Sequence, residues 1–367
     1  MPEAERHHAF TFRPAAGGGN GVPYGPAVMK TGGFHGGAAG AAEADLQASD
    51  MPAAGPTDRR QDRVVLGIAL VVLAAMTFPL LNASVKFLTA FYPLLMIICI
   101  RYFTHMVYTS IAFFPRYGWR LFWPSRPVLQ LARSLLLLGA TACFFNAVTT
   151  LPLTTASTIA FTGPLLITAL SVPLLGEKVG IQRWSAVAVG FLGAVIVVQP
   201  WAGGPQGDAG GPASYLAALS AFGSALCYAF YQIAGRKLAA HDPPETSICV
   251  TAVVAVIVTG IVGIFQIDWV PMVEWWHVLV FAATGLFGGF GHYFVTRALV
   301  YAPASVLSPF DYAQLLGATL LGYFIFGNFP DIYTWIGAAI IVASGMFITW
   351  REYRLSIARR QAAALAL

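Results

Sequence analysis

The stretch Val64–Ser84 reads VVLGIALVVLAAMTFPLLNAS, which is 21 residues without a formal charge. A helix rises about 1.5 Å per residue, so about 20 residues cross a hydrocarbon core of about 30 Å. Lipid offers no partner to backbone N–H and C=O groups, and a helix satisfies these groups within itself. The stretch therefore predicts a transmembrane helix.

Further apolar runs of similar length follow it, separated by short breaks. They lie at about 93–114, 130–150, 154–175, 184–200, 213–234, 246–267, 276–297, 305–327 and 332–350. Strands of a membrane barrel have about 10 residues and alternate in polarity, which these runs do not. We therefore predict an all-α integral membrane protein with ten transmembrane helices.

The composition excludes several classes of protein. The 367 residues are 57% hydrophobic and only 10% charged, whereas a soluble domain is about 25% charged. So little charge cannot supply the solvated surface of a soluble enzyme, a disordered chain or a nucleic-acid-binding protein. The expected partners are the lipid bilayer and a small-molecule solute, with no nucleic acid, and both a monomer and a homodimer remain open.

The Lys and Arg residues predict the orientation. With the N-terminus in the cytoplasm, almost all of them fall in inside segments, and Lys86 alone falls outside. The inside set is Arg59, Arg60, Arg63, Arg116, Arg120, Arg126, Lys178, Arg183, Arg236, Lys237, Arg297, Arg351, Arg354, Arg359 and Arg360. An excess of basic residues on the cytoplasmic side is the usual pattern. We expect a multi-pass protein of the cell inner membrane with both termini cytoplasmic.

The two ends of the chain differ from the rest. Residues 1–62 are rich in Gly, Ala and Pro without an apolar period, which predicts a disordered cytoplasmic tail with Met51 as an alternative translation start. Residues 351–367 form the expected C-terminal cytoplasmic tail. The adjacent His7 and His8 are expected to be solvated, and all four cysteines lie in apolar runs. We therefore expect neither a metal site nor a cofactor.

An internal repeat divides the apolar part of the chain. A shift of 151 positions brings Pro152 onto Pro303, Gly176 onto Gly327 and Trp184 onto Trp335. The units are residues 63–200 and 213–350, joined by a periplasmic linker at 201–212. Each unit holds five predicted helices, and because five is odd the second unit enters the membrane inverted. Inverted repeats are typical of secondary transporters, whose site lies near the midplane between the units.

Several motifs carry a family resemblance. Residues 151–164 (LPLTTASTIAFTGP) and 174–178 (LLGEK), with Arg183-Trp184 and a similar second copy over 302–345, resemble the EamA repeat of the drug/metabolite transporter superfamily. Asn328 stands where the first copy has Glu177. The resemblance implies ten helices around a central cavity. It also implies transport, without ATP, of solutes such as amino acids, amines, S-adenosylmethionine, riboflavin or drugs.

Asp311 is the only acid well inside a predicted run, and ionisable groups there are functional by default. Ser308, Asp311 and Gln314 recur every three residues beside Tyr312, and we expect one polar stripe on a single helix. The stripe serves solute binding or proton coupling, and a structural cap or ion pair is the alternative. Pro309 lies close by and, like Pro79 and Pro164, is expected to bend its helix.

The remaining candidates lie on other runs. Arg101 and His105 share one helix face, and Arg101 either holds an anionic group or ties helices together. His292 follows a set of glycines expected to allow close helix packing. The candidates for stacking on a planar ligand are Phe78, Phe161, Tyr228 and Tyr231, and ordinary lipid or core contacts are the alternative. Arg133, near a helix end, is expected to extend its side chain to the headgroups.

These observations predict a secondary transporter that moves a small organic metabolite across the inner membrane by alternating access. The candidate solutes are an amino acid, an amine, a compound like S-adenosylmethionine or a vitamin, or a drug. A membrane-embedded enzyme acting on lipid would need a cluster of catalytic groups at one interface. A passive channel would need a continuous polar lining. Direction, coupling and the identity of the solute stay open.

Overall fold

The computed structural model describes residues 56–175, 180–202, 211–238, 241–266, 270–302 and 304–365. Side chains are described in the same ranges other than 56–63, 175, 266, 304–305, 308, 352 and 356–365. The expected N-terminal tail up to residue 55, most of the linker at 201–212 and the end of the C-terminal tail lie outside this description.

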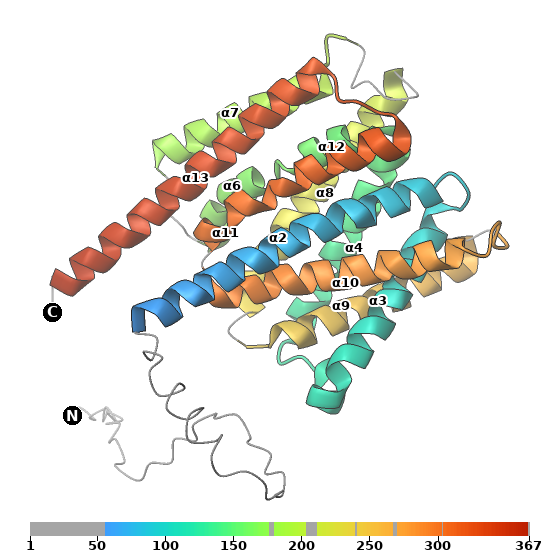
Figure 1. Ribbon diagram of the computed structural model, residues 1–367, viewed down its shortest axis with the longest axis horizontal. Helices are drawn as coiled ribbons and strands as arrows, with labels where there is room; N and C mark the ends of the chain where they lie inside the picture. The colour runs from blue at the N-terminus through green and yellow to red at the C-terminus, as the bar shows by residue number, and fades with distance from the viewer. Residues whose placement is uncertain are drawn as a thin grey trace, which may run out of the picture. The chain divides into compact units, whose positions relative to one another are not determined.

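All regular elements within these ranges are helices (Figure 1). They are α2 (Pro56–Leu88), α3 (Leu94–Tyr117), the 3-10 helix η1 (Gly118–Phe122), α4 (Pro127–Thr150), α5 (Leu153–Ala160), α6 (Gly163–Leu175), α7 (Ile181–Val198), α8 (Gly211–Leu238), α9 (Pro244–Gln266), α10 (His277–Tyr301), α11 (Ala304–Asp311), α12 (Ala313–Phe326) and α13 (Ile332–Leu365). Helix α2 begins at Pro56, inside the segment that was expected to be an unstructured tail as far as residue 62.

Nine helical segments of the described chain are long and apolar enough to cross a membrane. The ninth run expected from the sequence, 305–327, is not in this set; its described part forms α11 and α12, as the fourth run forms α5 and α6. The prediction of an all-helical membrane protein is confirmed. The number of ten transmembrane helices stays a prediction, and the structure adds that the ninth run is broken at Tyr312.

The break has a counterpart in the first half of the chain. Helix α5 ends at Ala160 and α6 begins at Gly163, and the shift of 151 places Ala160 on Asp311. Pro164 therefore lies in the first turn of a helix, where its missing N–H costs nothing. The two breaks meet in space, because the rings of Phe161 and Tyr312 have centroids 5.2 Å apart.

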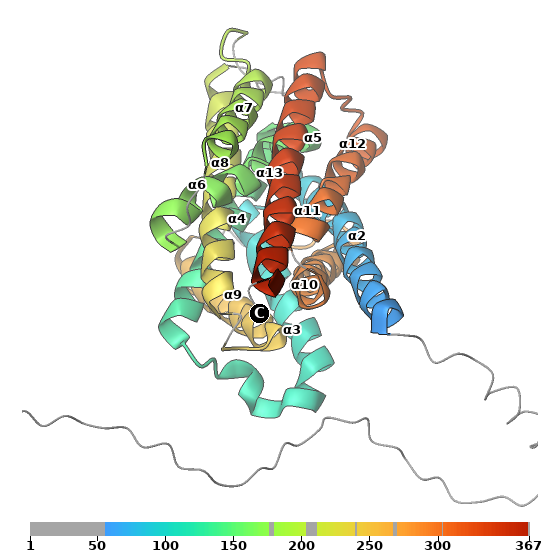
Figure 2. The same ribbon diagram turned by 90° about the vertical axis from the view of Figure 1, so that its left-hand side faces the viewer.

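Helix packing pairs the two halves of the chain. The most extensive interfaces are α2 with α10 and α4 with α8, and the 151-residue shift exchanges these two pairs. The same shift places α3 on α9 and α7 on α13, so each of these two interfaces is formed by a pair of equivalent helices. Helix α7 lies beside α13 in both views (Figures 1 and 2). Each half therefore packs mainly against the other half.

Glycines of α10 allow its close approach to α2 and α3, as the sequence predicted. A Cβ at Gly288 would lie 2.8 Å from Nη2 of Arg101, and one at Gly291 would lie 2.9 Å from Oγ1 of Thr77. Real Cβ atoms essentially never come so near a heavy atom, so these helices meet at glycine backbone. Small residues allow such contacts between membrane helices.

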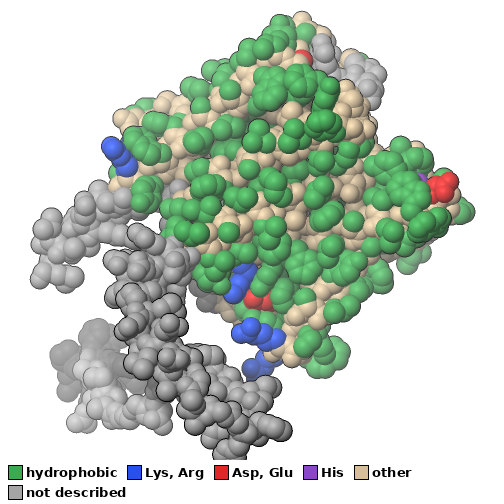
Figure 3. Space-filling view, in the orientation of Figure 1, with side chains coloured by type: hydrophobic (Ala, Val, Ile, Leu, Met, Phe, Trp, Pro, Cys, Tyr) green, Lys and Arg blue, Asp and Glu red, His purple; other side chains and the backbone are tan. Residues whose placement is uncertain are grey.

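The outer surface carries large apolar side chains. Ile264 is 78% exposed and Phe324 is 77% exposed. In Figure 3 hydrophobic side chains cover most of the described face, and the charged groups lie toward its margins. A soluble monomer rarely exposes so large an apolar area, whereas lipid solvates it. Lys86 does not face lipid, because its Nζ donates to the carbonyls of Val148 and Leu151 at the end of α4, at 3.0 and 2.7 Å.

Candidate functional site

Polar and aromatic side chains from five helices gather in the interior. We call them the central polar cluster: Arg101 and His105 of α3, Arg133 of α4, Tyr228 and Tyr231 of α8, His292 of α10, and Asp311 of α11. Burying such groups is costly unless each finds a partner. The partners of each group therefore indicate what the cluster can do.

Arg101 is almost fully buried, with 1% of its surface exposed. Its guanidinium carbon lies 4.5 Å from the ring centroid of Tyr102 and 5.4 Å from that of Phe145, in the range of cation–π contacts. Its Nε and Nη1 atoms have no hydrogen-bond partner among the described residues. No ion pair joins Arg101 to Asp311 within that part of the chain.

His105 lies one turn further along α3 and is also buried. Its ring stacks on Tyr102 with centroids 6.1 Å apart, and a Cβ at Gly289 would lie 2.8 Å from its Cδ2. Neither ring nitrogen has a hydrogen-bond partner among the described residues. The structure thus places His105 tightly between α3 and α10.

His292 lies between the two buried arginines. Its ring makes an edge contact with Phe78 at 5.0 Å and faces Tyr231 at 6.4 Å. Both Arg101 and Arg133 are within its electrostatic range. The His292 side chain is half-buried.

Arg133 does not extend to the headgroups, and that prediction was wrong. Only 4% of its surface is exposed, its Nη2 donates to the hydroxyl of Tyr231 at 2.8 Å, and its guanidinium carbon lies 4.3 Å from the ring centroid of Tyr231. The neighbouring residues in the sequence could have predicted this burial. Gln130 and Ser134 share the helix face of Arg133, and both contact Thr251 of α9. A polar face on an apolar helix turns toward protein.

The pairing of Arg133 with Tyr231 gives a measurable prediction. In a double-mutant cycle of Arg133→Gln and Tyr231→Phe, we expect a coupling energy of about 1.5–3 kcal/mol in the free energy of unfolding, as for a hydrogen bond to a charged group. The control cycle is Tyr102→Phe with Thr141→Val, whose hydroxyls lie 2.9 Å apart without a formal charge. It should give about 0.5–1.5 kcal/mol. A smaller coupling for the arginine pair than for the control would contradict this assignment.

Asp311 closes the cluster on the side of the helix breaks. It lies within electrostatic range of Tyr228, whose ring stacks on Tyr231 with centroids 5.6 Å apart. The Tyr228 hydroxyl accepts a hydrogen bond from Nε2 of Gln232 at 3.2 Å. Asp311 Oδ1 is buried without a hydrogen-bond partner among the described residues. The aromatic pair thus lies between Asp311 and Arg133.

The single polar stripe expected on one helix is not what the structure shows. Asp311 is the last residue of α11, and Gln314 belongs to α12, where it is half-buried. The helix break between them ends the common face that spacing alone implied. Tyr312 lies in the break, packs on Phe161, and places its hydroxyl against Gly345 of α13. The side chain of Ser308 is outside the described residues.

The charges of the cluster do not balance. It holds two buried guanidinium groups and one carboxylate, and five of their nitrogen and oxygen atoms lack a hydrogen-bond partner among the described residues. Such atoms are costly to bury, so a polar ligand or water that completes their hydrogen bonds gains free energy. The aromatic rings around them offer flat surfaces for stacking. No group of three metal-binding side chains occurs in the described part of the chain.

Two stretches of the chain match one known protein family. The EamA-like transporter family matches residues 65–199 and again 215–350. A riboflavin transporter of Rhizobium johnstonii is 31% identical over 295 residues, which is 80% of this chain and 93% of the relative. An S-adenosylmethionine uptake transporter of Rickettsia prowazekii is 28% identical over 253 residues, or 68% of this chain and 82% of the relative.

A solved crystal structure has a similar fold. Its TM-score is 0.57 at 21% sequence identity, over 80% of this chain and 99% of the other. At this identity the likeness concerns the fold alone.

A riboflavin transporter of Vibrio cholerae is 34% identical over 204 residues, which is 55% of this chain and 64% of the relative.

Proposed function

The chain belongs to the EamA-like transporter family and transports small metabolites, and we propose that it does so by alternating access around the central polar cluster. The observation that carries this proposal is the cluster itself. Its unpartnered polar atoms and aromatic rings come from helices of both repeats. A site between two repeats is where secondary transporters bind their solute.

The solute we propose carries a flat heteroaromatic ring and a polar or charged group. Riboflavin and S-adenosylmethionine, named for two relatives, both contain a fused heteroaromatic ring system. Phe78, Tyr228 and Tyr231 offer rings to stack on it, and His292 lies among them. The unpartnered nitrogens of Arg101 and Arg133 suit an anionic or carbonyl oxygen of the same solute.

The proposed movement uses the internal symmetry of the fold. We propose two inverted repeats of five spans, with α5–α6 and α11–α12 each counting as one broken span. The exchange of interfaces by the 151-residue shift supports this, because it makes two equivalent packings available. Broken helices beside a site are common in transporters. Phe161 and Tyr312, which touch where the two breaks meet, are placed to respond when the halves rearrange.

The orientation and coupling are further parts of the proposal. The distribution of Lys and Arg supports an inner-membrane protein with both termini in the cytoplasm. Asp311 is the proposed coupling residue, because its carboxylate can take up and release a proton beside the solute. The second candidate is facilitated diffusion, in which the solute moves down its own gradient without proton coupling.

The proposal is tested by solute flux into proteoliposomes that contain the full chain. We expect saturable uptake of at least one of riboflavin and S-adenosylmethionine, competed by an excess of the unlabelled solute, at pH 6 or pH 8. Protein-free vesicles are the control. Flux that does not saturate would indicate a channel, and chemical change of the lipid without flux would indicate an enzyme. Both results contradict the proposal.

A further inference from the structure

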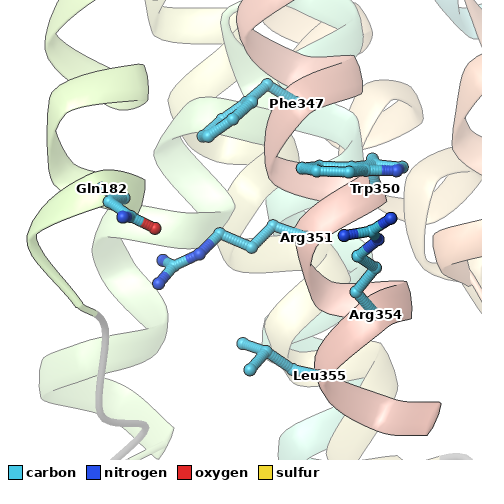
Figure 4. Close-up of a pocket in the computed structure, with 6 residues that line it drawn as sticks. All are labelled: Gln182, Phe347, Trp350, Arg351, Arg354 and Leu355. Carbon is cyan, nitrogen blue, oxygen red and sulfur yellow. The ribbon is translucent and has the colours of Figure 1, made fainter. Parts of the chain in front are cut away.

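A pocket that includes no residue of the central polar cluster lies between the start of α7 and the end of the apolar part of α13 (Figure 4). Its volume is about 580 Å³, within the usual range for small-ligand pockets, about 300–1,000 Å³. The residues around it are Gln182, Phe347, Trp350, Arg351, Arg354 and Leu355. Neither the family assignment nor the transport function gives this pocket a role.

The position of the pocket is set by the sequence of α13. The apolar run of this helix ends at Trp350, and Arg351 and Arg354 follow within the next turn. Trp is enriched at membrane interfaces, and arginines just beyond an apolar run lie at headgroup level. The pocket therefore lies where the hydrocarbon core meets the headgroups.

The two arginines present their charge to the pocket in different ways. The guanidinium carbon of Arg354 lies 4.7 Å from the ring centroid of Trp350, which holds it beside the indole. Arg351 points across the pocket toward α7 (Figure 4), where its Nη1 lies 3.6 Å from the place of a Cβ on Gly180. No carboxylate is among the six residues that line the pocket.

We propose that this pocket binds the headgroup of an anionic phospholipid. Arginine binds phosphate through paired N–H donors, and two such groups face a pocket whose described lining residues include no acid. Phe347 and Leu355 supply apolar walls on either side of the arginines, as a glycerol backbone and the start of an acyl chain require. A free phosphate ion would gain nothing from these walls.

A lipid at this place contacts both repeats at once. Helices α7 and α13 are the last helices of the two repeats and pack against each other along their length. Gln182 comes from α7 and the other five residues come from α13. The bound lipid therefore acts as a bridge between the two halves at the membrane surface.

The test measures lipid binding, so it does not depend on the transport function. The purified full chain is titrated with phosphatidylglycerol or phosphatidylcholine in detergent, and bound lipid is counted by native mass spectrometry. We expect the wild type to bind phosphatidylglycerol more tightly than phosphatidylcholine. The double variant Arg351→Gln/Arg354→Gln should weaken phosphatidylglycerol binding about tenfold, since each basic group near an anionic lipid contributes to its affinity, and leave phosphatidylcholine unchanged.

The matched control is Arg116→Gln/Arg120→Gln. Arg116 and Arg120 are likewise two arginines at the end of a helical segment, both of them exposed, and the guanidinium carbon of Arg116 lies 5.9 Å from the ring centroid of Tyr117. Equal weakening in the control, or none in the pocket variant, would overturn the proposal. Displacement of the lipid by millimolar inorganic phosphate would assign the pocket to a free anion instead and so overturn it as well.

A second variant leaves the charges in place. In Gly180→Leu the new side chain fills the space opposite the Arg351 guanidinium. Its Cβ would be only in ordinary van der Waals contact with Nη1 and Nη2 of Arg351. We expect Gly180→Leu to weaken phosphatidylglycerol binding while the melting temperature without lipid stays that of the wild type. Unchanged lipid binding in this variant would contradict the position of the site.

Discussion

Asp311→Asn is expected to lower solute flux by at least about tenfold, which is about 1.4 kcal/mol in the barrier to transport. Asp311 supplies the only carboxylate of the central polar cluster, and its Oδ1 is buried without a hydrogen-bond partner among the described residues. Asparagine keeps the shape of the side chain but cannot ionise or exchange a proton. Flux is measured in proteoliposomes with the solute that the wild type transports best, at two pH values.

The same substitution should not weaken the fold. Removing a buried charge that has no partner relieves its desolvation cost, so the melting temperature in detergent should stay the same or rise. The control is Asp331→Asn, because Asp331 accepts the Thr334 backbone N–H at 2.8 Å at the start of α13. Asparagine caps a helix about as well. Asp331 also accepts from Nε2 of Gln199, and the Gln199 amide can turn so that its oxygen accepts from the new asparagine, so both flux and melting temperature should be retained. Wild-type flux and pH response in Asp311→Asn would remove Asp311 from the mechanism.

The second large effect is expected on stability. Gly285→Ala should lower the free energy of unfolding by about 3 kcal/mol, at the upper end of the cost of overpacking. A Cβ on Gly285 would overlap Oγ1 of Thr104 and lie 2.6 Å from the backbone nitrogen of His105. The backbone of α3 cannot move aside without shifting Arg101 and His105. Unfolding in mixed detergent measures the difference.

Gly260→Ala is the matched control for this substitution. Gly260 is also a helical glycine, in α9, but among the described residues no atom outside its own stretch of helix lies within 4 Å of the place of its Cβ. Alanine favours a helix over glycine by about 1 kcal/mol, so the control should be neutral or more stable. The two variants are therefore expected to differ in sign. Equal stability of both would contradict the close packing of α10 on α3.

Most of the fold is predictable from the length of the apolar runs. The mean hydropathy of successive stretches of sequence locates the membrane spans well, because the thickness of the hydrocarbon core requires about the same length of every span. The break at Tyr312 is hidden from such a measure, because Asp311 and Gln314 are too few polar residues to interrupt an apolar run of this length. Pro309 pointed to the right region, but it lies inside α11, and the helix ends two residues later.

The site was predictable in part, for a related reason. Asp311, Arg101, His105 and His292 stand out because ionisable groups inside apolar runs are rare. Arg133 was missed because it lies near the start of its run, where an interfacial arginine is common. Its burial depends on Tyr231, which is 98 positions away in sequence, and only the packing of α4 on α8 brings the two together.

The interleaved packing of the two halves has a consequence for how the protein is made. The main partner of α2 is α10, and about 190 residues separate the end of one from the start of the other. At about 5–20 residues per second, the ribosome takes about 10–40 s to supply that partner. During this interval α2 is threaded into the bilayer with its future interface covered only by lipid. We therefore expect the insertion of α2 to precede its assembly with α10, and each half expressed alone to lack most of its interface partners.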